Sequence, residues 1–166
     1  GQVMTYNSST GLIDLADAAS GASVSDDLYI ANPSSATDPT AAGTNAVAIG
    51  SGAVAATNQS IALGLNATVG TSTRGTALGY SANATGSQAT AISDSTASGG
   101  NSFAAVADAT ASATDSIALG RATTASSDYA TAIGKNSSDQ GSVATSGTAA
   151  MALGGSYASG TNSFAA

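Results

Sequence analysis

The five residues SIALG occur twice in this chain, at 60–64 and again at 116–120, fifty-six positions apart. Two related stretches, AVAIG at 46–50 and ATAIG at 130–134, each lie fourteen positions from one of these copies. Because fifty-six is four times fourteen, one repeat of about fourteen residues accounts for all four stretches. A fixed internal period of this kind is typical of a repeat architecture.

The last residue of the motif serves as the anchor of each repeat. Successive anchors are separated by 14, 15, 14, 13, 14, 14 and 20 residues, so only the last interval carries an excess, of six residues. The anchors are Gly50, Gly64, Gly79, Ser93, Val106, Gly120, Gly134 and Gly154. Alanine lies two positions before every anchor, at Ala48, Ala62, Ala77, Ala91, Ala104, Ala118, Ala132 and Ala152. The last four residues, SFAA at 163–166, repeat the SFAA that precedes Val106, so a further repeat begins there.

Large and small residues alternate within the repeat, and a period of two indicates a strand. The positions one and three before the anchor hold mainly aliphatic side chains or threonine, as at Ile61 and Leu63, whereas the positions two and four before it hold mainly Ala, Ser or Gly. Fourteen residues suffice for two strands of about five residues with a turn after each. The sequence therefore predicts an all-β parallel solenoid of ~14-residue coils that stack about 4.8 Å apart.

The segment before the repeats differs in kind and divides the chain into two regions. Residues 1–42 are predicted to form a cap or junction, and residues 43–166 the repeat region. Within the first region, GQVMTYNSSTGLIDL predicts two short strands around a Ser-Ser-Thr-Gly turn, and DDLYIANPSSATDPTAAG predicts a strand and a loop that contains proline. The six-residue excess lies within 135–150.

The charge of the chain restricts its partners. All ten acidic residues are aspartates and the bases are Arg74, Arg121 and Lys135, which gives a net charge of −7. This charge repels nucleic acid and anionic membrane surfaces, so neither is an expected partner. No apolar run approaches the ~20 residues of a membrane span, and insertion into a membrane is not expected. The absence of cysteine fits a protein exported unfolded to an extracellular place.

The core of one chain is predicted to be thin. Each lap has about two large apolar side chains, worth roughly 1.5–3 kcal/mol each, against a backbone ordering cost of roughly 1–2 kcal/mol per residue. Self-association is therefore expected. The alanine column is expected to lie where a second backbone comes close, and threefold symmetry suits a fibrous rod.

Catalytic and metal sites are not predicted. The chain has no His, no Cys and a single Lys, so the usual nucleophilic dyads and triads have no members and zinc lacks its ligands. Asp26 and Asp27 are adjacent and would point to opposite sides of a strand, which does not suit the carboxylate pair of a glycosidase. The remaining aspartates are scattered and form no calcium motif. We expect neither enzyme activity nor a cofactor.

Three sets of surface residues are candidates for binding. The excess segment is expected to expose Lys135, Asn136, Asp139 and Gln140, and loops on rigid scaffolds often carry recognition, although a harmless insertion also explains the segment. Three tyrosines are expected either to make contacts or to cover lap edges: Tyr80, Tyr129 and Tyr157. Threonine columns can bind ice, but five threonines interrupt an aliphatic column rather than forming an outward grid: Thr76, Thr90, Thr123, Thr124 and Thr131.

The motifs NAVAIG, QSIALG, DSIALG, YATAIG and NSFAA resemble the head repeats of trimeric autotransporter adhesins, the YadA-like head, across residues 43–166. This resemblance implies a left-handed parallel β-roll in an obligate homotrimer, at the tip of an extracellular, outer-membrane-anchored fibre that binds host matrix proteins, glycans or other surfaces. Ser93 and Val106 depart from the family's anchor glycine, and the basic neck motif that usually follows the head is missing. GQVMTYNSSTGL also resembles junctions in bacteriophage tail fibres, which use the same repeats. A tail-fibre segment for host recognition, or a spacer, is therefore the alternative.

Overall fold

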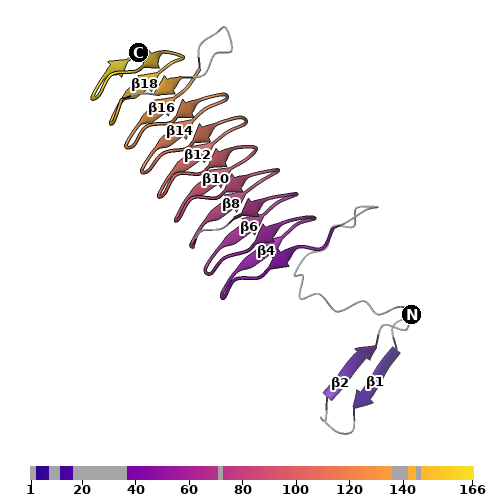
Figure 1. Cartoon of the computed structure of the whole chain (residues 1–166). Helices are drawn as coiled ribbons and strands as arrows, with labels where there is room; N and C mark the ends of the chain where they lie inside the picture. Colours follow the sequence, from indigo (N-terminus) through magenta and orange to yellow (C-terminus); the bar gives the residue numbers. More distant parts are fainter. Residues whose placement is uncertain (1–2, 8–11, 17–36, 71–72, 136–141, 145–146) are drawn as a thin grey trace.

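The computed structural model describes residues 3–7, 12–16, 37–70, 73–135, 142–144 and 147–166 (Figure 1). All regular elements among these residues are strands, as the period of two predicts. The first two, β1 (Val3–Asn7) and β2 (Leu12–Ala16), pair in an antiparallel hairpin, which confirms the two short strands expected in the opening segment. The strand expected in DDLYIANP lies outside the described residues.

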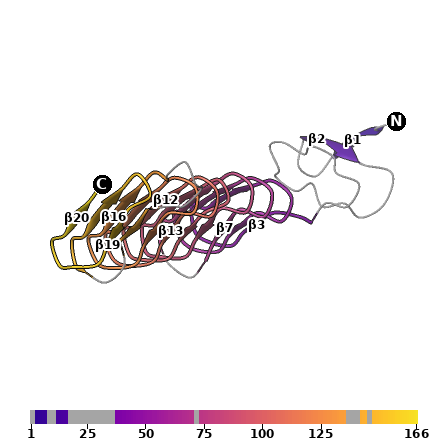
Figure 2. The ribbon, with the colours of Figure 1, turned by 90° about the horizontal axis from the view of Figure 1, so that it is seen from above.

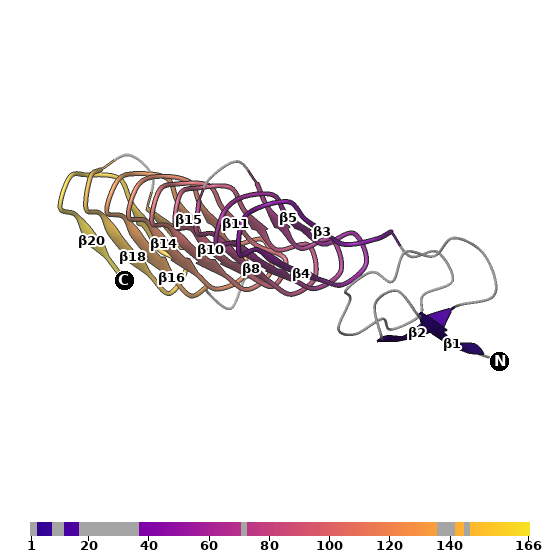
Figure 3. The ribbon, with the colours of Figure 1, turned by 90° about the horizontal axis from the view of Figure 1, so that it is seen from below.

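The other strands build a parallel solenoid with two walls. One wall, the even-strand sheet, contains β4 (Val47–Ile49), β6 (Ile61–Leu63), β8 (Thr76–Leu78), β10 (Thr90–Ile92), β12 (Phe103–Ala105), β14 (Ile117–Leu119), β16 (Thr131–Ile133), β18 (Met151–Leu153) and β20 (Phe164–Ala165). The other, the odd-strand sheet, contains β3 (Thr40–Ala41), β5 (Val54–Ala55), β7 (Thr68–Val69), β9 (Asn83–Ala84), β11 (Thr96–Ala97), β13 (Thr110–Ala111), β15 (Thr124–Ala125), β17 (Val143–Ala144) and β19 (Tyr157–Ala158). Figures 2 and 3 show the two walls from opposite sides.

Each strand pairs with its equivalent in the next lap, so the sequence repeat is also the structural repeat. The two SIALG copies form β6 and β14, and the alanine of each motif pairs with the alanine of the following lap, as in Ala104↔Ala118 and Ala118↔Ala132. The six-residue excess does not break this register, because Ala132 still pairs with Ala152. Ala152 in turn pairs with Ala165, which places the final SFAA in the next lap. The parallel solenoid of ~14-residue coils is thus confirmed.

Alanine fills the space between the two walls. The alanines at the centres of the even strands β6 to β18 are fully buried, and so are most alanines that end the odd strands, such as Ala55, Ala84 and Ala111. Val69 is the largest fully buried side chain among the residues whose burial is described. A coil of about fourteen residues has two short walls close together, so only small side chains fit between them.

Backbone turns with positive φ connect the walls at both edges of each lap. At one edge, the anchor residue itself has a positive φ, as at Gly64, where φ is +135°. At the other edge, the residue five positions before the anchor does so in every described lap: Asn45, Gln59, Arg74, Gln88, Asn101, Asp115, Tyr129, Ala149 and Asn162. Both edges therefore project ladders of side chains along the rod.

Candidate functional site

The outer surface of the even-strand sheet is apolar along the whole solenoid. The first and third residues of these strands point away from the core, and many are large and exposed, for example Ile61 (42%), Leu63 (43%) and Met151 (40%). The same surface includes further aliphatic and aromatic side chains, and we call the set the apolar face: Val47, Ile49, Leu78, Ile92, Phe103, Ile117, Leu119, Ile133, Leu153 and Phe164. Soluble monomers rarely expose a continuous apolar surface of this extent. The apolar face is therefore the main candidate interaction surface.

The structure reverses the expected roles of the two columns in the even strands. The sequence predicts that the large side chains fill the core of the chain and that the alanines contact another backbone. Ala62 and Ala118 are instead fully buried within their own coil, whereas Ile117 and Leu119 are 39% and 38% exposed. The close backbone that the alanines accommodate belongs to the opposite wall of the same chain. The surface free for a partner is thus the aliphatic column.

Three threonines interrupt the apolar face without dividing it. Thr76, Thr90 and Thr131 begin even strands and are half-buried. Thr76 and Thr90 pair with each other, between Ile61 and Phe103 of the flanking laps. Thr131 pairs with Ile117 and Met151. Thr123 has a different role, since it is fully buried and its hydroxyl donates to the carbonyl of Gly120 at 2.8 Å. Thr124 lies on the odd-strand sheet. The five threonines considered as one group therefore occupy three different environments.

Charged residues of the solenoid lie on the turn edges and not on the walls. No Asp, Arg or Lys falls within β3 to β20. Asp94 and Asp108 follow anchors at one edge, and Asp115 and Asp128 lie in the turns of the other. Each wall of the described solenoid therefore presents an uncharged surface to the outside.

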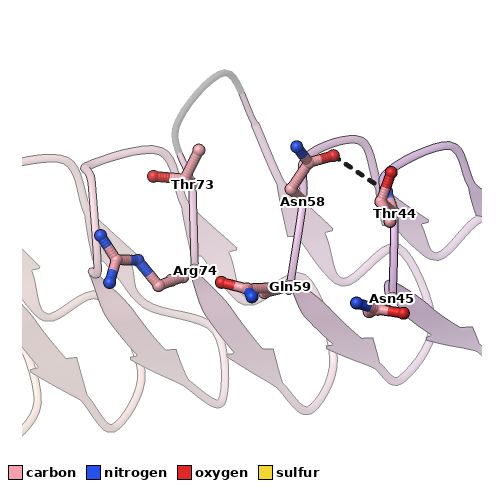
Figure 4. A pocket seen from close by; sticks show the side chains of 6 residues that line it. All are labelled: Thr44, Asn45, Asn58, Gln59, Thr73 and Arg74. Carbon is pink, nitrogen blue, oxygen red and sulfur yellow. Dashed lines mark hydrogen bonds between the residues drawn. The ribbon is translucent and has the colours of Figure 1, made fainter.

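A polar hollow lies on the edge that precedes the even strands (Figure 4). Its volume is about 270 Å³, and its walls come from three consecutive turns: Thr44, Asn45, Asn58, Gln59, Thr73 and Arg74. Asn58 ties two of these turns together, because its Oδ1 accepts a hydrogen bond from the backbone N of Thr44 at 2.9 Å. Arg74 adds a positive charge, but the hollow is open and borders the apolar face. A partner on that face would lie beside it.

The predicted anchor glycines are needed where laps approach closely. A Cβ added at Gly64 would lie 2.5 Å from the carbonyl oxygen of Gly79, and one at Gly50 would lie 2.7 Å from that of Gly64. Gly120 is similarly close to Gly134, whereas Gly134 and Gly154 have more room. Ser93 and Val106 also have positive φ values, so the turn keeps its shape where glycine is replaced.

The other predicted contact residues are only partly described. Lys135 is exposed, while Asn136, Asp139 and Gln140 lie outside the described residues. The three predicted tyrosines are all exposed but lie on different parts of the coil. Tyr80 lies in the turn after an anchor, Tyr129 in a turn before an even strand, and Tyr157 in β19. They do not form one surface.

Within the described part of the chain, no group of three or more aspartates is placed to hold a metal ion. No helix there is long and apolar enough to cross a membrane.

Comparison with known families agrees with the motifs. The family model of the YadA head domain repeat (2 copies) matches residues 41–67, 71–92 and 111–137. This part of the chain therefore belongs to the YadA head repeats, which confirms the resemblance seen in the sequence. No curated protein gives a match.

Proposed function

We propose that this chain is a non-catalytic binding head of an extracellular trimeric fibre and attaches that fibre to a host or other surface. The family match supports an adhesin-like head, since YadA head repeats form part of such fibres. The observation that carries the proposal is the apolar face, which runs along the whole solenoid and requires a partner. Second and third copies of this chain are the occupants that fit it.

Three copies account for the surface better than other partners do. The apolar face is straight, uncharged and repeats with every lap, so an identical rod matches it along its full length. Burial of each of its large side chains contributes up to about 1.5–3 kcal/mol, which compensates for a core made of alanine. Closed symmetry allows each copy to use the same surface. The odd-strand sheets and the turn edges then form the outside of the head.

Attachment through such a head depends on repetition and not on a deep pocket. Individual contacts on a flat polar wall are weak, but three walls on each head and many heads on a surface multiply them.

Deletion of whole laps, one after another, tests whether adhesion depends on the number of repeats. Deletion of residues 107–120 removes fourteen residues, so the remaining strands keep their register.

Beads coated with the purified chain should adhere to at least one matrix protein, cell type or abiotic material, and adhesion should fall as laps are deleted. The matched control is the chain with one lap deleted, after circular dichroism has shown that it retains its β structure. Adhesion that does not change with the number of laps would refute binding by the repeats. No adhesion across a broad panel would instead favour the spacer role, in a bacterial fibre or in a bacteriophage tail fibre.

A further inference from the structure

The odd-strand sheet carries a regular grid of hydroxyl groups on its outer surface. Thr96, Thr110 and Thr124 occupy the same position in three consecutive laps and pair directly with one another. Two residues further along each lap lies a serine. These six residues form what we call the hydroxyl grid: Thr96, Ser98, Thr110, Ser112, Thr124 and Ser126.

The backbone holds both columns of the grid in place. The backbone nitrogens of Thr96 and Thr110 donate to carbonyls of the next lap at 2.9 and 2.8 Å, and those of Ser98 and Ser112 do the same at 2.9 and 3.0 Å. The residue between each pair, such as Ala111, is fully buried, so the threonine and the serine on either side of it point outward. β-branching further restricts the threonine side chains. The grid is therefore flat and fixed before any ligand binds.

Five of the six hydroxyls of the grid are available to an external ligand. Among the residues that the structure describes, the side chains of Thr96, Ser98, Thr110, Ser112 and Thr124 have no hydrogen-bond partner. No charged residue lies in the three grid segments 96–98, 110–112 and 124–126, and this wall lies on the opposite side of the coil from the apolar face. Copies that associate through the apolar face thus leave the grid on the outside.

The spacing of the grid is close to that of water molecules in ice. Laps of a parallel sheet repeat at about 4.8 Å, and alternate residues along a strand lie about 6.6 Å apart. Water oxygens in ice are hydrogen-bonded tetrahedrally at about 2.75 Å, so second neighbours lie about 4.5 Å apart and the hexagonal axis repeats at about 7.3 Å. The difference along the rod is about 0.3 Å per lap, so it accumulates to about 0.6 Å from Thr96 to Thr124. Across the strands, the threonine and serine columns differ from the ice repeat by about 0.7 Å, a single step that does not accumulate.

We propose that the hydroxyl grid binds the surface of ice. The ligand is an ordered array of water molecules that accept and donate hydrogen bonds at the grid spacing, while the threonine methyl groups fill the gaps between them. This activity goes beyond the attachment function proposed above and does not depend on it. It also differs from the threonines considered in the sequence analysis, since only Thr124 belongs to both sets.

Ice affinity of the intact chain provides the test. Ice is grown slowly from a solution of the fluorescently labelled protein, and the fraction incorporated into the ice is compared with that of labelled serum albumin. We expect at least tenfold more incorporation than for albumin. Thr110→Lys places a long charged side chain in the middle of the grid and should reduce incorporation to the albumin level. Thr96→Lys repeats this test in the neighbouring lap.

The matched control places the same side chain on a turn edge. Ser87 is exposed there and lies away from the grid, so Ser87→Lys should retain full incorporation. Circular dichroism confirms that the compared variants are folded. Exclusion of the unmodified chain from ice would overturn the proposal, as would equal incorporation of Thr110→Lys, Thr96→Lys and Ser87→Lys. Retention on an insoluble neutral polysaccharide without incorporation into ice would also overturn it and assign the grid to carbohydrate.

Discussion

The anchor residue of each lap keeps a left-handed backbone whether or not it is glycine. φ is +119° at Gly50 and +135° at Gly64, but it is also positive at Ser93 (61°) and at Val106 (81°). A β-branched residue strongly disfavours this region. The hydrogen bonds between neighbouring laps therefore impose the turn on residues that would not adopt it alone.

Gly64→Ala should destabilise the solenoid. The new Cβ would lie 2.5 Å from the Gly79 carbonyl oxygen, and φ at this position already disfavours a side chain. We expect a loss of roughly 1–3 kcal/mol in the free energy of unfolding, measured by thermal or denaturant unfolding. Gly100→Ala is the control, because a Cβ there meets no heavy atom within 4 Å and should leave the stability nearly unchanged. Equal effects of the two substitutions would contradict the close lap contact at Gly64.

Val106→Gly should have the opposite effect and stabilise the chain. Relief of the strained backbone at Val106 gains roughly 1–3 kcal/mol, whereas the extra freedom of glycine in the unfolded chain costs roughly 0.5–1 kcal/mol. The melting temperature should rise. Thr96→Gly, in a strand without positive φ, should lower the melting temperature. A decrease in both variants would show that Val106 is not strained.

Positive φ recurs in three columns of the repeat, at the anchor, two positions after it and five positions before it, and the sequence revealed only the anchor column. The anchor column was visible because glycine recurs there. The residue five positions before the anchor also has a positive φ, but it varies in type from Asn45 and Asp115 to Arg74 and Tyr129. Asn and Asp tolerate this conformation better than most residues, and their repeated presence in one column was the available signal.

At the scale of the strands, the period of two predicts alternation but not which set of residues lies inside. Either column of an even strand satisfies the pattern. The size of the coil decides the matter, because walls of two or three residues lie too close together for leucine or isoleucine and leave space only for alanine. The unbroken alanine column was therefore the sign of the core. The number of laps and the register followed from the period alone. The expected strand length of about five residues was wrong, because the turns take up more of each lap and leave strands of two or three residues.

Ala118→Leu tests this packing. Ala118 is fully buried between the walls, so a leucine should overpack the coil and lower the free energy of unfolding by roughly 1–3 kcal/mol. Ala56→Leu makes the same substitution at an exposed position and should cost much less. Chemical denaturation of both variants measures the difference. Similar stabilities would mean that position 118 does not lie in a tight core.

The six-residue excess shows how an element can vary without disturbing its neighbours. The nitrogen of Gly154 donates to the carbonyl of Ile133 at 2.9 Å, and Thr131 pairs with Met151, so β16 and β18 are adjacent despite twenty residues between their anchors. The excess therefore leaves β16 and β18 paired in the same register as the other neighbouring even strands.

At the scale of the whole molecule, the solenoid has two unlike walls. One is apolar, the other carries uncharged polar residues with few large apolar side chains, and the charges of the described solenoid lie on the edges between them. This arrangement favours association through one wall only. It leaves the second wall and the charged edges in contact with solvent.

Ile117→Asp should prevent that association. The substitution places a charge in the middle of the apolar face, where burial against another copy would leave it without a partner. Light scattering should give three times the mass of one chain for the unmodified protein and a much smaller mass for the variant. Ser112→Asp, on the opposite wall, should remain trimeric. A monomeric unmodified chain at micromolar concentration would contradict the trimer.

The direction of the hydrogen bonds between laps has a mechanical consequence. Bonds such as the one from Thr110 N to Thr123 O, which is 2.8 Å long, run along the rod. Tension between the ends of the rod should therefore break these bonds one lap at a time. Each released lap would lengthen the tether by about 43 Å, which is fourteen residues at about 3.4 Å less the 4.8 Å rise. Single-molecule pulling should therefore give a staircase of equal steps, and one abrupt rupture of the whole rod would contradict it. A fibre that yields in this way absorbs shocks from flowing liquid while its far end stays attached.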